Sequence, residues 1–317
     1  DTTHIIVVQG ATEVSEVGGL AEQCADCEIR FAPDGESLAR ALPGADILLG
    51  WNFAARELRD CWHLADDVRW VHWCGAGVDA ALFPGMVEGN AVLTNARGIF
   101  DDAMAEYTLG LVLTFAKGFK QTFEAQTERR WAYAATETIA GKRALVVGAG
   151  SIGSAVGKQL RAAGMQVSGV ARSARPASEV FDAVHSIDQL DNVLPDADYV
   201  VLVTPLTPST EGLFNADKFK RMAPHARFVN LGRGQLVVED DLMAALNEGT
   251  IDGAALDVFY TEPLGADSPL WTTPNLIVSP HMSGDFVGFK DVMAEQFYAN
   301  FARYKTGEPL VNVVDKV

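Results

Sequence analysis

The chain has 317 residues, 48% of them hydrophobic, which is enough for two globular domains that each bury a core of their own. Its formal net charge of −17 would repel phosphate backbones and anionic lipids, so nucleic acid and membrane surfaces are excluded as expected partners. The four cysteines lack zinc-site spacing, the given N-terminal residues do not have the pattern of a secretory leader, and nowhere do eighteen apolar residues follow one another. We therefore expect a cytoplasmic protein without a structural metal.

Short apolar runs alternate with helix-compatible stretches over the first third of the chain. Strands that alternate with helices form parallel sheets, so this pattern predicts a small α/β domain. The expected strands lie at residues 5–8, 46–49, 68–73 and 92–94.

A long helix is predicted from Asp101 to about Arg130. Asp101 and Asp102 stand in its first turn, where negative charge suits the positive end of the helix dipole. Its apolar residues lie on more than one face, and such a helix must be covered on several sides. We expect this helix to link two domains and to offer a dimer interface.

A second set of strands and helices follows and predicts a doubly wound parallel sheet. Its expected strands lie at residues 143–147, 166–171, 199–203, 227–230, 251–256 and 276–278, with helices at 151–163 and after Val238. A last helix is expected at 285–304, and residues 312–314 are expected to return to the first domain.

A glycine-rich turn stands between the strand at 143–147 and the helix that follows it. The glycines of this GxGxxG pattern permit a tight turn at Gly148, close approach of a pyrophosphate at Gly150 and close helix packing at Gly153. Ser151 and Ile152 begin the helix, whose N-terminus attracts negative charge. The context predicts a dinucleotide site, and Thr204 and Pro205, after the strand at 199–203, are assigned to it as well.

The end of the next strand bears on the choice of cofactor. An NAD-binding chain usually has an acidic residue there for the ribose hydroxyls, whereas this chain reads Arg172-Ser173-Ala174-Arg175. Two guanidinium groups and a hydroxyl suit a 2′-phosphate, so NADP(H) is preferred over NAD(H). The alternative, that Arg172 and Arg175 only decorate an exposed loop, keeps NAD(H) possible.

Three chemically reactive side chains each follow a strand end. Arg233 follows the strand at 227–230, Glu262 the strand at 251–256, and His281 the strand at 276–278. Open α/β sheets bind ligands at this end of their strands, and a guanidinium can hold a carboxylate there through two hydrogen bonds. Each residue alone has an ordinary structural explanation, but together beside a cofactor site they predict a catalytic group.

Several motifs, in their order along nearly the whole chain, resemble the D-isomer-specific 2-hydroxyacid dehydrogenase family. They are Gly148-Ala149-Gly150-Ser151-Ile152-Gly153, Asn230-Leu231-Gly232-Arg233-Gly234, Leu256-Asp257-Val258-Phe259, Glu262-Pro263-Leu264 and Ser279-Pro280-His281. Gly75-Ala76-Gly77-Val78-Asp79 is similar to the substrate-carboxylate loop of that family.

The resemblance implies two Rossmann-like, doubly wound parallel-sheet domains with a cleft between them. Residues 1–101, completed by 286–317, would bind substrate, and residues 102–285 would bind the dinucleotide. Arg233 would bind substrate, His281 would act as acid and base, Glu262 would orient His281, and Asp257 would face the nicotinamide end. Gly75, Ala76 and Gly77 would hold the substrate carboxylate through backbone N–H groups.

We therefore predict an oxidoreductase that transfers hydride between NADP(H) and a small 2-oxo acid or D-2-hydroxy acid, and that forms a homodimer. Reduction of a 2-oxo acid needs a proton for the new alkoxide and a cation for the carboxylate, which His281 and Arg233 can supply. Two alternatives stay open at this point: a glyoxylate or hydroxypyruvate reductase that uses NAD(H), and a non-catalytic protein that senses dinucleotides.

Overall fold

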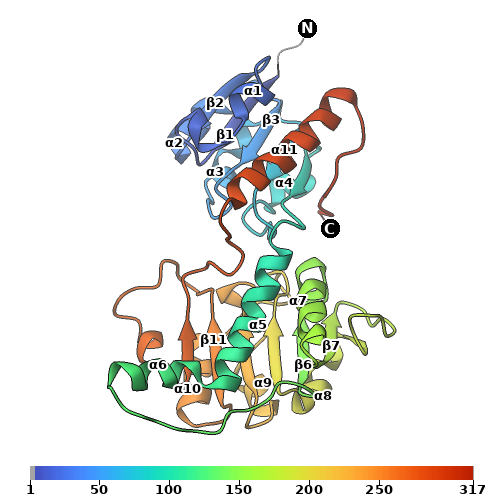
Figure 1. Cartoon of the computed structure of the whole chain (residues 1–317). Coiled ribbons are helices and arrows are strands. Elements are labelled where there is room, and N and C mark those ends of the chain that lie inside the picture. Colours follow the sequence, from blue (N-terminus) through green and yellow to red (C-terminus); the bar gives the residue numbers. More distant parts are fainter. Residues whose placement is uncertain (1–3, 317) are drawn as a thin grey trace. The chain divides into compact units, whose positions relative to one another are not determined.

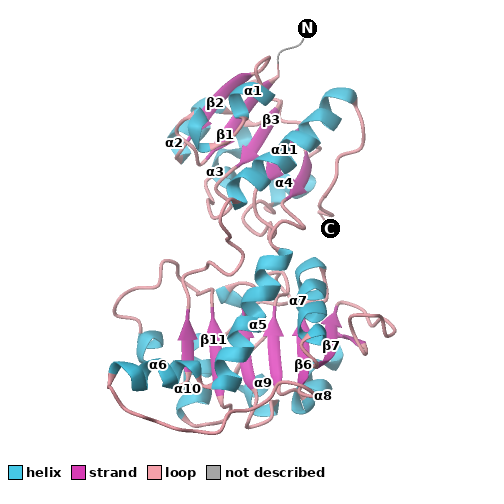
Figure 2. Ribbon diagram, viewed as in Figure 1, coloured by secondary structure: helices cyan, strands magenta, loops and turns pink. Residues whose placement is uncertain are grey.

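The computed structural model describes residues 4–316, which form two compact units (Figure 1). One unit takes the described residues up to Ile99 together with those from Phe286 onward, and the other is Phe100–Asp285. Figure 2 shows that each unit contains a sheet with helices packed on it. Both sheets are parallel throughout their strand pairs, which confirms the predicted fold class.

The first unit is built on a five-stranded sheet in the order β2-β1-β3-β4-β5. Its strands are β1 (Ile5–Gln9), β2 (Glu28–Ala32), β3 (Ile47–Gly50), β4 (Trp70–Trp73) and β5 (Val92–Asn95). Its helices are α1 (Leu20–Gln23), α2 (Gly35–Ala41), α3 (Leu58–Cys61), α4 (Pro84–Glu88) and α11 (Phe289–Thr306), with 3-10 turns at Val14–Glu16 and Trp62–Leu64. The predicted return of the C-terminus to this unit is confirmed, because Val313 forms a bridge with Thr94 and Val314 N donates to Leu93 O at 2.8 Å.

The second unit is built on a seven-stranded sheet in the order β12-β11-β10-β9-β6-β7-β8. Its strands are β6 (Arg143–Val147), β7 (Gln166–Ala171), β8 (Val184–Ser186), β9 (Tyr199–Leu202), β10 (Arg227–Asn230), β11 (Gly253–Leu256) and β12 (Leu276–Val278). Its helices are α5 (Asp101–Lys117), α6 (Phe119–Thr127), α7 (Ser151–Ala162), α8 (Leu190–Val193), α9 (Ala216–Arg221) and α10 (Glu239–Asn247). Its 3-10 turns are Ile187–Gln189, Leu194–Asp196, Gly234–Leu236 and Pro269–Thr272.

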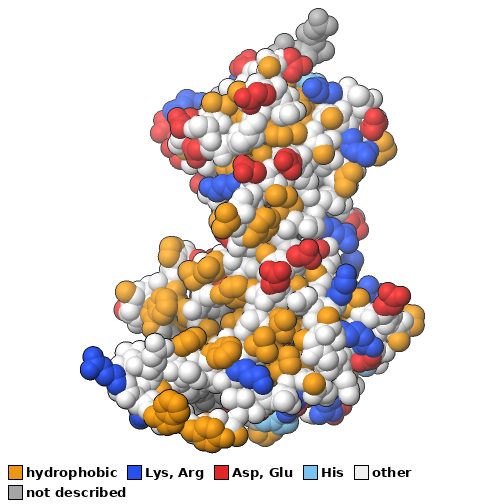
Figure 3. Space-filling model, viewed as in Figure 1, with side chains coloured by type: hydrophobic (Ala, Val, Ile, Leu, Met, Phe, Trp, Pro, Cys, Tyr) orange, Lys and Arg blue, Asp and Glu red, His pale blue; other side chains and the backbone are white. Residues whose placement is uncertain are grey.

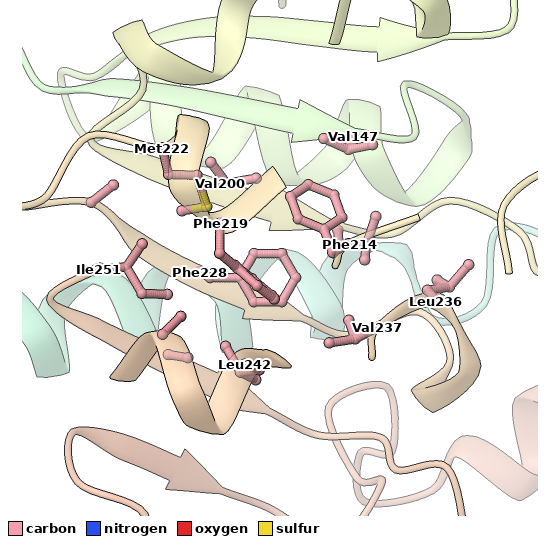
Figure 4. Close-up of a cluster of buried hydrophobic side chains, with 14 of the residues drawn as sticks. Val147, Val200, Phe214, Phe219, Met222, Phe228, Leu236, Val237, Leu242 and Ile251 are labelled. Atoms are coloured by element: carbon pink, nitrogen blue, oxygen red, sulfur yellow. The ribbon is translucent and has the colours of Figure 1, made fainter. Parts of the chain in front are cut away.

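One hydrophobic core cluster of the second unit lies between its sheet and the helices that pack on it. Figure 4 shows the side chains of Phe219 and Phe228 next to one another in this cluster, with Phe214 close by. The ring centroids of Phe214 and Phe228 are 4.7 Å apart, and those of Phe219 and Phe228 are 5.4 Å apart. All three side chains are fully buried, and each contributes about 1.5–3 kcal/mol to the free energy of folding through the water it excludes.

Two predicted helices differ from the structure. The single helix expected to about Arg130 is broken at Gly118, which adopts a left-handed φ of 59° and separates α5 from α6. The helix expected from Asp285 begins only at Phe289, because the preceding Gly288 has a φ of 89°. The strands β2 and β8 are not among the predicted ones: β2 is partly exposed and contains two charged residues, and only one of the three residues of β8 is apolar.

Candidate active site

The cofactor pattern lies where the second sheet changes its winding direction. β6 sits between β9 and β7 in the sheet, so the connections that leave these strands diverge at the carboxyl end of β6. Open α/β sheets bind ligands in the crevice at this point. Gly148 follows β6 directly, and Ser151 begins α7, so the glycine-rich turn occupies this position.

The backbone of this turn fits a dinucleotide diphosphate. Gly148 has a φ of 113°, and a Cβ there would lie 2.6 Å from Thr204 N, so only glycine allows this contact with the β9 end. A Cβ at Gly153 would lie 1.9 Å from Gly148 O. By contrast, a Cβ at Gly150 would meet no atom within 4 Å, so the protein's own packing leaves room there for a ligand. The residues present thus form a cradle at the N-terminus of a twelve-residue helix.

The arginines predicted to recognise a 2′-phosphate lie beside this turn. Gly148 N and Ala149 N donate to Val170 O at 2.9 and 3.0 Å, which joins the turn to the end of β7. Arg172 and Ser173 follow β7 and are exposed, and Arg175 donates from Nη2 to Ala149 O at 2.7 Å. The structure therefore brings the predicted arginine segment and the glycine-rich turn to one edge of the sheet.

Arg233 lies in the loop after β10, beside the loop that carries Glu262. A Cβ at Gly234 would lie 1.9 Å from the carbonyl carbon of Phe259, so the glycine allows the two loops to touch. The charge of Arg233 contributes to lowering the pKa of Glu262. The structure thus places the predicted cation and the predicted carboxylate at adjacent strand ends.

Glu262 and His281 form a hydrogen-bonded pair, with Nδ1 of His281 2.7 Å from Oε2 of Glu262. Oε1 of Glu262 accepts a second hydrogen bond, from Phe259 N at 2.9 Å. Burial alone would raise the pKa of Glu262, but these two hydrogen bonds and the charges of His281 and Arg233 together hold it below its usual value. Glu262 is therefore a carboxylate at neutral pH and accepts a hydrogen bond from Nδ1–H of the imidazole.

The loop that carries His281 is fastened to the residue after β11. His281 has a left-handed φ of 51°, and its N–H donates to Asp257 O at 2.7 Å. The side chain of Asp257, predicted to face the nicotinamide, is fully buried and accepts hydrogen bonds from Ser279 Oγ, Met282 N and Ser283 N. Sequence reasoning missed Ser279, although its position two residues before His281 could have indicated it.

Comparison with known proteins decides the family. A model described as the NAD binding domain of the D-isomer specific 2-hydroxyacid dehydrogenases matches residues 109–283, more than half of the chain. The chain belongs to this family. A glyoxylate/hydroxypyruvate reductase A from Escherichia fergusonii is 31% identical over 89% of this chain and 94% of its own.

Two solved structures of similar proteins each match 99% of this chain over 99% of their own. The D-isomer specific 2-hydroxyacid dehydrogenase from Xanthobacter autotrophicus, in complex with NADPH and MES, is 30% identical with a TM-score of 0.84. The NADPH-dependent glyoxylate/hydroxypyruvate reductase from Sinorhizobium meliloti, in complex with NADP and sulfate, is 28% identical with a TM-score of 0.87. This member of the D-isomer specific 2-hydroxyacid dehydrogenases is thus an NAD(P)-dependent enzyme, as the sequence predicted.

Of the remaining predicted site residues of this dehydrogenase, Thr204 and Pro205 follow β9 in the second unit, and the others lie in the first unit. Gly75, Ala76 and Gly77 follow β4, and Ala76 O accepts a hydrogen bond from Asn95 Nδ2 at 2.8 Å. Within residues 4–316 the N–H groups of Ala76 and Gly77 donate to no backbone carbonyl, so this loop can offer them to an anion.

The described residues were also compared with the requirements of a membrane-spanning helix and of a metal site. None of their helices is both long and apolar enough to cross a bilayer. Among the same residues, no group of three or more His, Cys, Asp or Glu side chains could hold a metal ion.

Proposed function

We propose that the enzyme is an NADPH-dependent reductase of small 2-oxo acids, with glyoxylate and hydroxypyruvate as its first candidate substrates. The observation that carries this proposal is the clustering of Arg233, Glu262 and His281 on neighbouring strand ends of the sheet that also bears the glycine-rich turn. The similar enzymes from Escherichia fergusonii and Sinorhizobium meliloti are named for glyoxylate and hydroxypyruvate, which supports this substrate class.

Each side chain has a distinct part in the proposed reaction. When bound, the nicotinamide supplies the hydride. Arg233 binds the substrate carboxylate, and backbone N–H groups of Ala76 and Gly77 are proposed as its second contact. His281 donates the proton from Nε2 to the substrate's carbonyl oxygen as the alkoxide forms. Glu262 orients the imidazole through its Nδ1, which lies 2.7 Å from Oε2.

We assign the preference for NADP(H) to Arg172, Ser173 and Arg175. A guanidinium on the 2′-phosphate makes charge-assisted hydrogen bonds, whereas NADH has no phosphate to offer. We expect Arg172→Asp to raise the Kd of NADPH about 10- to 100-fold and that of NADH less than about threefold. Fluorescence titration of both cofactors measures this.

Lys158→Asp is the matched control for the cofactor experiment. It makes the same change of charge on the exposed surface of α7, away from the turn. The control should raise the Kd of NADPH and the Kd of NADH equally and only slightly. If Arg172→Asp also weakens NADPH and NADH equally, the arginine does not recognise the phosphate.

We further propose that the enzyme is a dimer that buries apolar surface around α6. Here the arm denotes residues 131–136, and the groove is lined by Thr114, Lys120, Phe123, Trp271 and residues 276–278. The arm is exposed along its whole length and takes part in no described hydrogen bond, with Trp131 96% and Tyr133 89% accessible. Its end is fixed, because Glu137 pairs with Arg227 at 2.7 Å.

The groove offers this arm a matching surface. Among the described strands, β12 lies at the edge of its sheet, and Phe123 and Trp271 are 63% and 51% exposed beside it. Exposed apolar patches mark interaction sites, and an unpaired sheet edge can pair with another chain. In Figure 3, hydrophobic side chains lie over much of the visible face of this unit. In the proposed dimer, the arm of each copy covers the groove of the other copy.

We expect sedimentation velocity at micromolar concentration to show a dimer, and Phe123→Asp to convert it to a monomer, because a charge in the patch costs desolvation. Val87→Asp, at an exposed valine on α4 in the other unit, is the control and should remain dimeric. A monomeric wild-type chain would overturn the interface.

A further inference from the structure

An acidic side chain lies at the N-terminus of α7, beside the glycine-rich turn. Asp101 is the first residue of α5, and Oδ2 of its carboxylate accepts a hydrogen bond from the hydroxyl of Ser151, the first residue of α7. Both residues belong to the second unit. The first turns of two helices therefore meet at one carboxylate.

The negative charge of Asp101 has little compensation from neighbouring side chains. Among residues 4–316, the neutral hydroxyl of Ser151 is the one side-chain donor to this carboxylate, and its Oδ1 is buried without a hydrogen-bond partner. Arg175, the cation beside the turn, donates to Ala149 O at 2.7 Å instead. Because a partly buried charge is screened less than an exposed one, this carboxylate acts strongly on any other charge brought close to it.

This carboxylate lies beside the N–H groups that would bind a diphosphate. The first N–H groups of an α-helix have no acceptor within the helix, and its positive end attracts anions. Gly150 leaves open space in front of these groups, since a Cβ there would meet no atom within 4 Å. Only the side chain of Ser151 separates the N–H of that residue from the Asp101 carboxylate. The carboxylate thus competes with a bound anion for the positive end of α7.

We propose that Asp101 limits the affinity of the enzyme for its dinucleotide by repelling the diphosphate. The hydroxyl of Ser151 donates to Asp101, so it is not free to donate to a phosphate oxygen. The proposal rests on the assignment of the glycine-rich turn to the diphosphate of the cofactor. NADPH and NADH share this diphosphate, so Asp101 should affect both equally, whereas Arg172 should affect NADPH alone.

Asp101→Asn removes the charge and keeps the shape of the side chain. Its amide oxygen can still accept the hydrogen bond from Ser151. We expect the Kd of NADPH and the Kd of NADH each to fall about three- to tenfold. A damaged fold weakens binding, so lost structure cannot produce this result. Asp101→Ala, which also removes the contact with Ser151, should lower both Kd values at least as much and keeps the test available if Asp101→Asn does not fold.

Isothermal titration calorimetry measures these Kd values, with ADP-ribose as a third ligand. ADP-ribose contains the diphosphate but no nicotinamide, so Asp101→Asn should lower its Kd by the same factor. Asp102→Asn is the matched control, because it removes the same charge from the next residue of α5, which is exposed. The control should change the Kd of each ligand less than about twofold, since water screens an exposed charge.

Three results would overturn the proposal. The first is an unchanged or higher Kd of NADPH and NADH in Asp101→Asn. The second is a lower Kd for both dinucleotides but not for ADP-ribose, which would place the effect at the nicotinamide end. The third is an equal decrease in Asp102→Asn. The titrations need no substrate, so they test Asp101 even if no 2-oxo acid is reduced.

Discussion

His281→Asn should lower kcat for the reduction of a 2-oxo acid by about 10²- to 10⁴-fold, the usual contribution of a general acid. The NH₂ group of asparagine can still donate a hydrogen bond to the Glu262 carboxylate, but asparagine has no acidic proton to give to the forming alkoxide. The glycine-rich turn and the arginines beside it are unchanged, so the Kd of NADPH should stay within about twofold. Stopped-flow single-turnover kinetics and fluorescence titration measure the two quantities.

The chain offers a close control for this substitution in His225. Its Nε2 lies 2.8 Å from Asp198 Oδ1, a pairing of the same kind as that of His281 with Glu262, but it precedes β10 at the opposite ends of the strands. His225→Asn should leave kcat unchanged. If His281→Asn keeps full turnover, another group donates the proton.

Arg233→Ala should lower kcat/KM for 2-oxo acids by about 10²- to 10³-fold, because it leaves the substrate carboxylate without its cation. Most of this loss should be in KM, since the carboxylate keeps its charge from substrate to product. Arg233→Lys should recover only part of it, because an ammonium cannot form the paired hydrogen bonds of a guanidinium. Steady-state kinetics over a range of substrate concentrations separates KM from kcat.

Arg161→Ala is the control for Arg233. This arginine pairs with Asp182 at 2.8 Å on the outer side of α7, and its loss should not change KM. A KM for 2-oxo acids that stays unchanged in Arg233→Ala would remove the arginine from the substrate site.

Much of the second unit could be predicted because local signals agreed there. The strands at Arg143–Val147, Gln166–Ala171, Arg227–Asn230 and Leu276–Val278 have the predicted limits, since each is a short apolar run bounded by turn residues. In β2, charged and apolar residues alternate from Glu28 to Phe31. This pattern indicates a strand less clearly than a continuous apolar run does, because the edge strand β2 is partly exposed. The break at Gly118 depends on a left-handed φ. Glycine permits this conformation but does not require it, so the sequence alone does not predict the break.

The proximity of the candidate site residues could be predicted, but only some of their contacts could. Strand ends predicted that Arg233, Glu262 and His281 would lie together, because parallel strands end at one edge. The contact of Gly234 with Phe259 and the hydrogen bond from Ser279 to Asp257 depend on how loops fold back on one another, which spacing along the chain does not encode. For the same reason the short contact between Asp101 and Ser151 was not anticipated.

The central claim is tested most directly by steady-state kinetics of the purified enzyme with NADPH and NADH across glyoxylate, hydroxypyruvate, pyruvate and longer 2-oxo acids. We expect NADPH to be oxidised with glyoxylate or hydroxypyruvate, at a kcat/KM at least about tenfold above that with NADH. Absence of NADPH oxidation with every one of these acids would contradict the account.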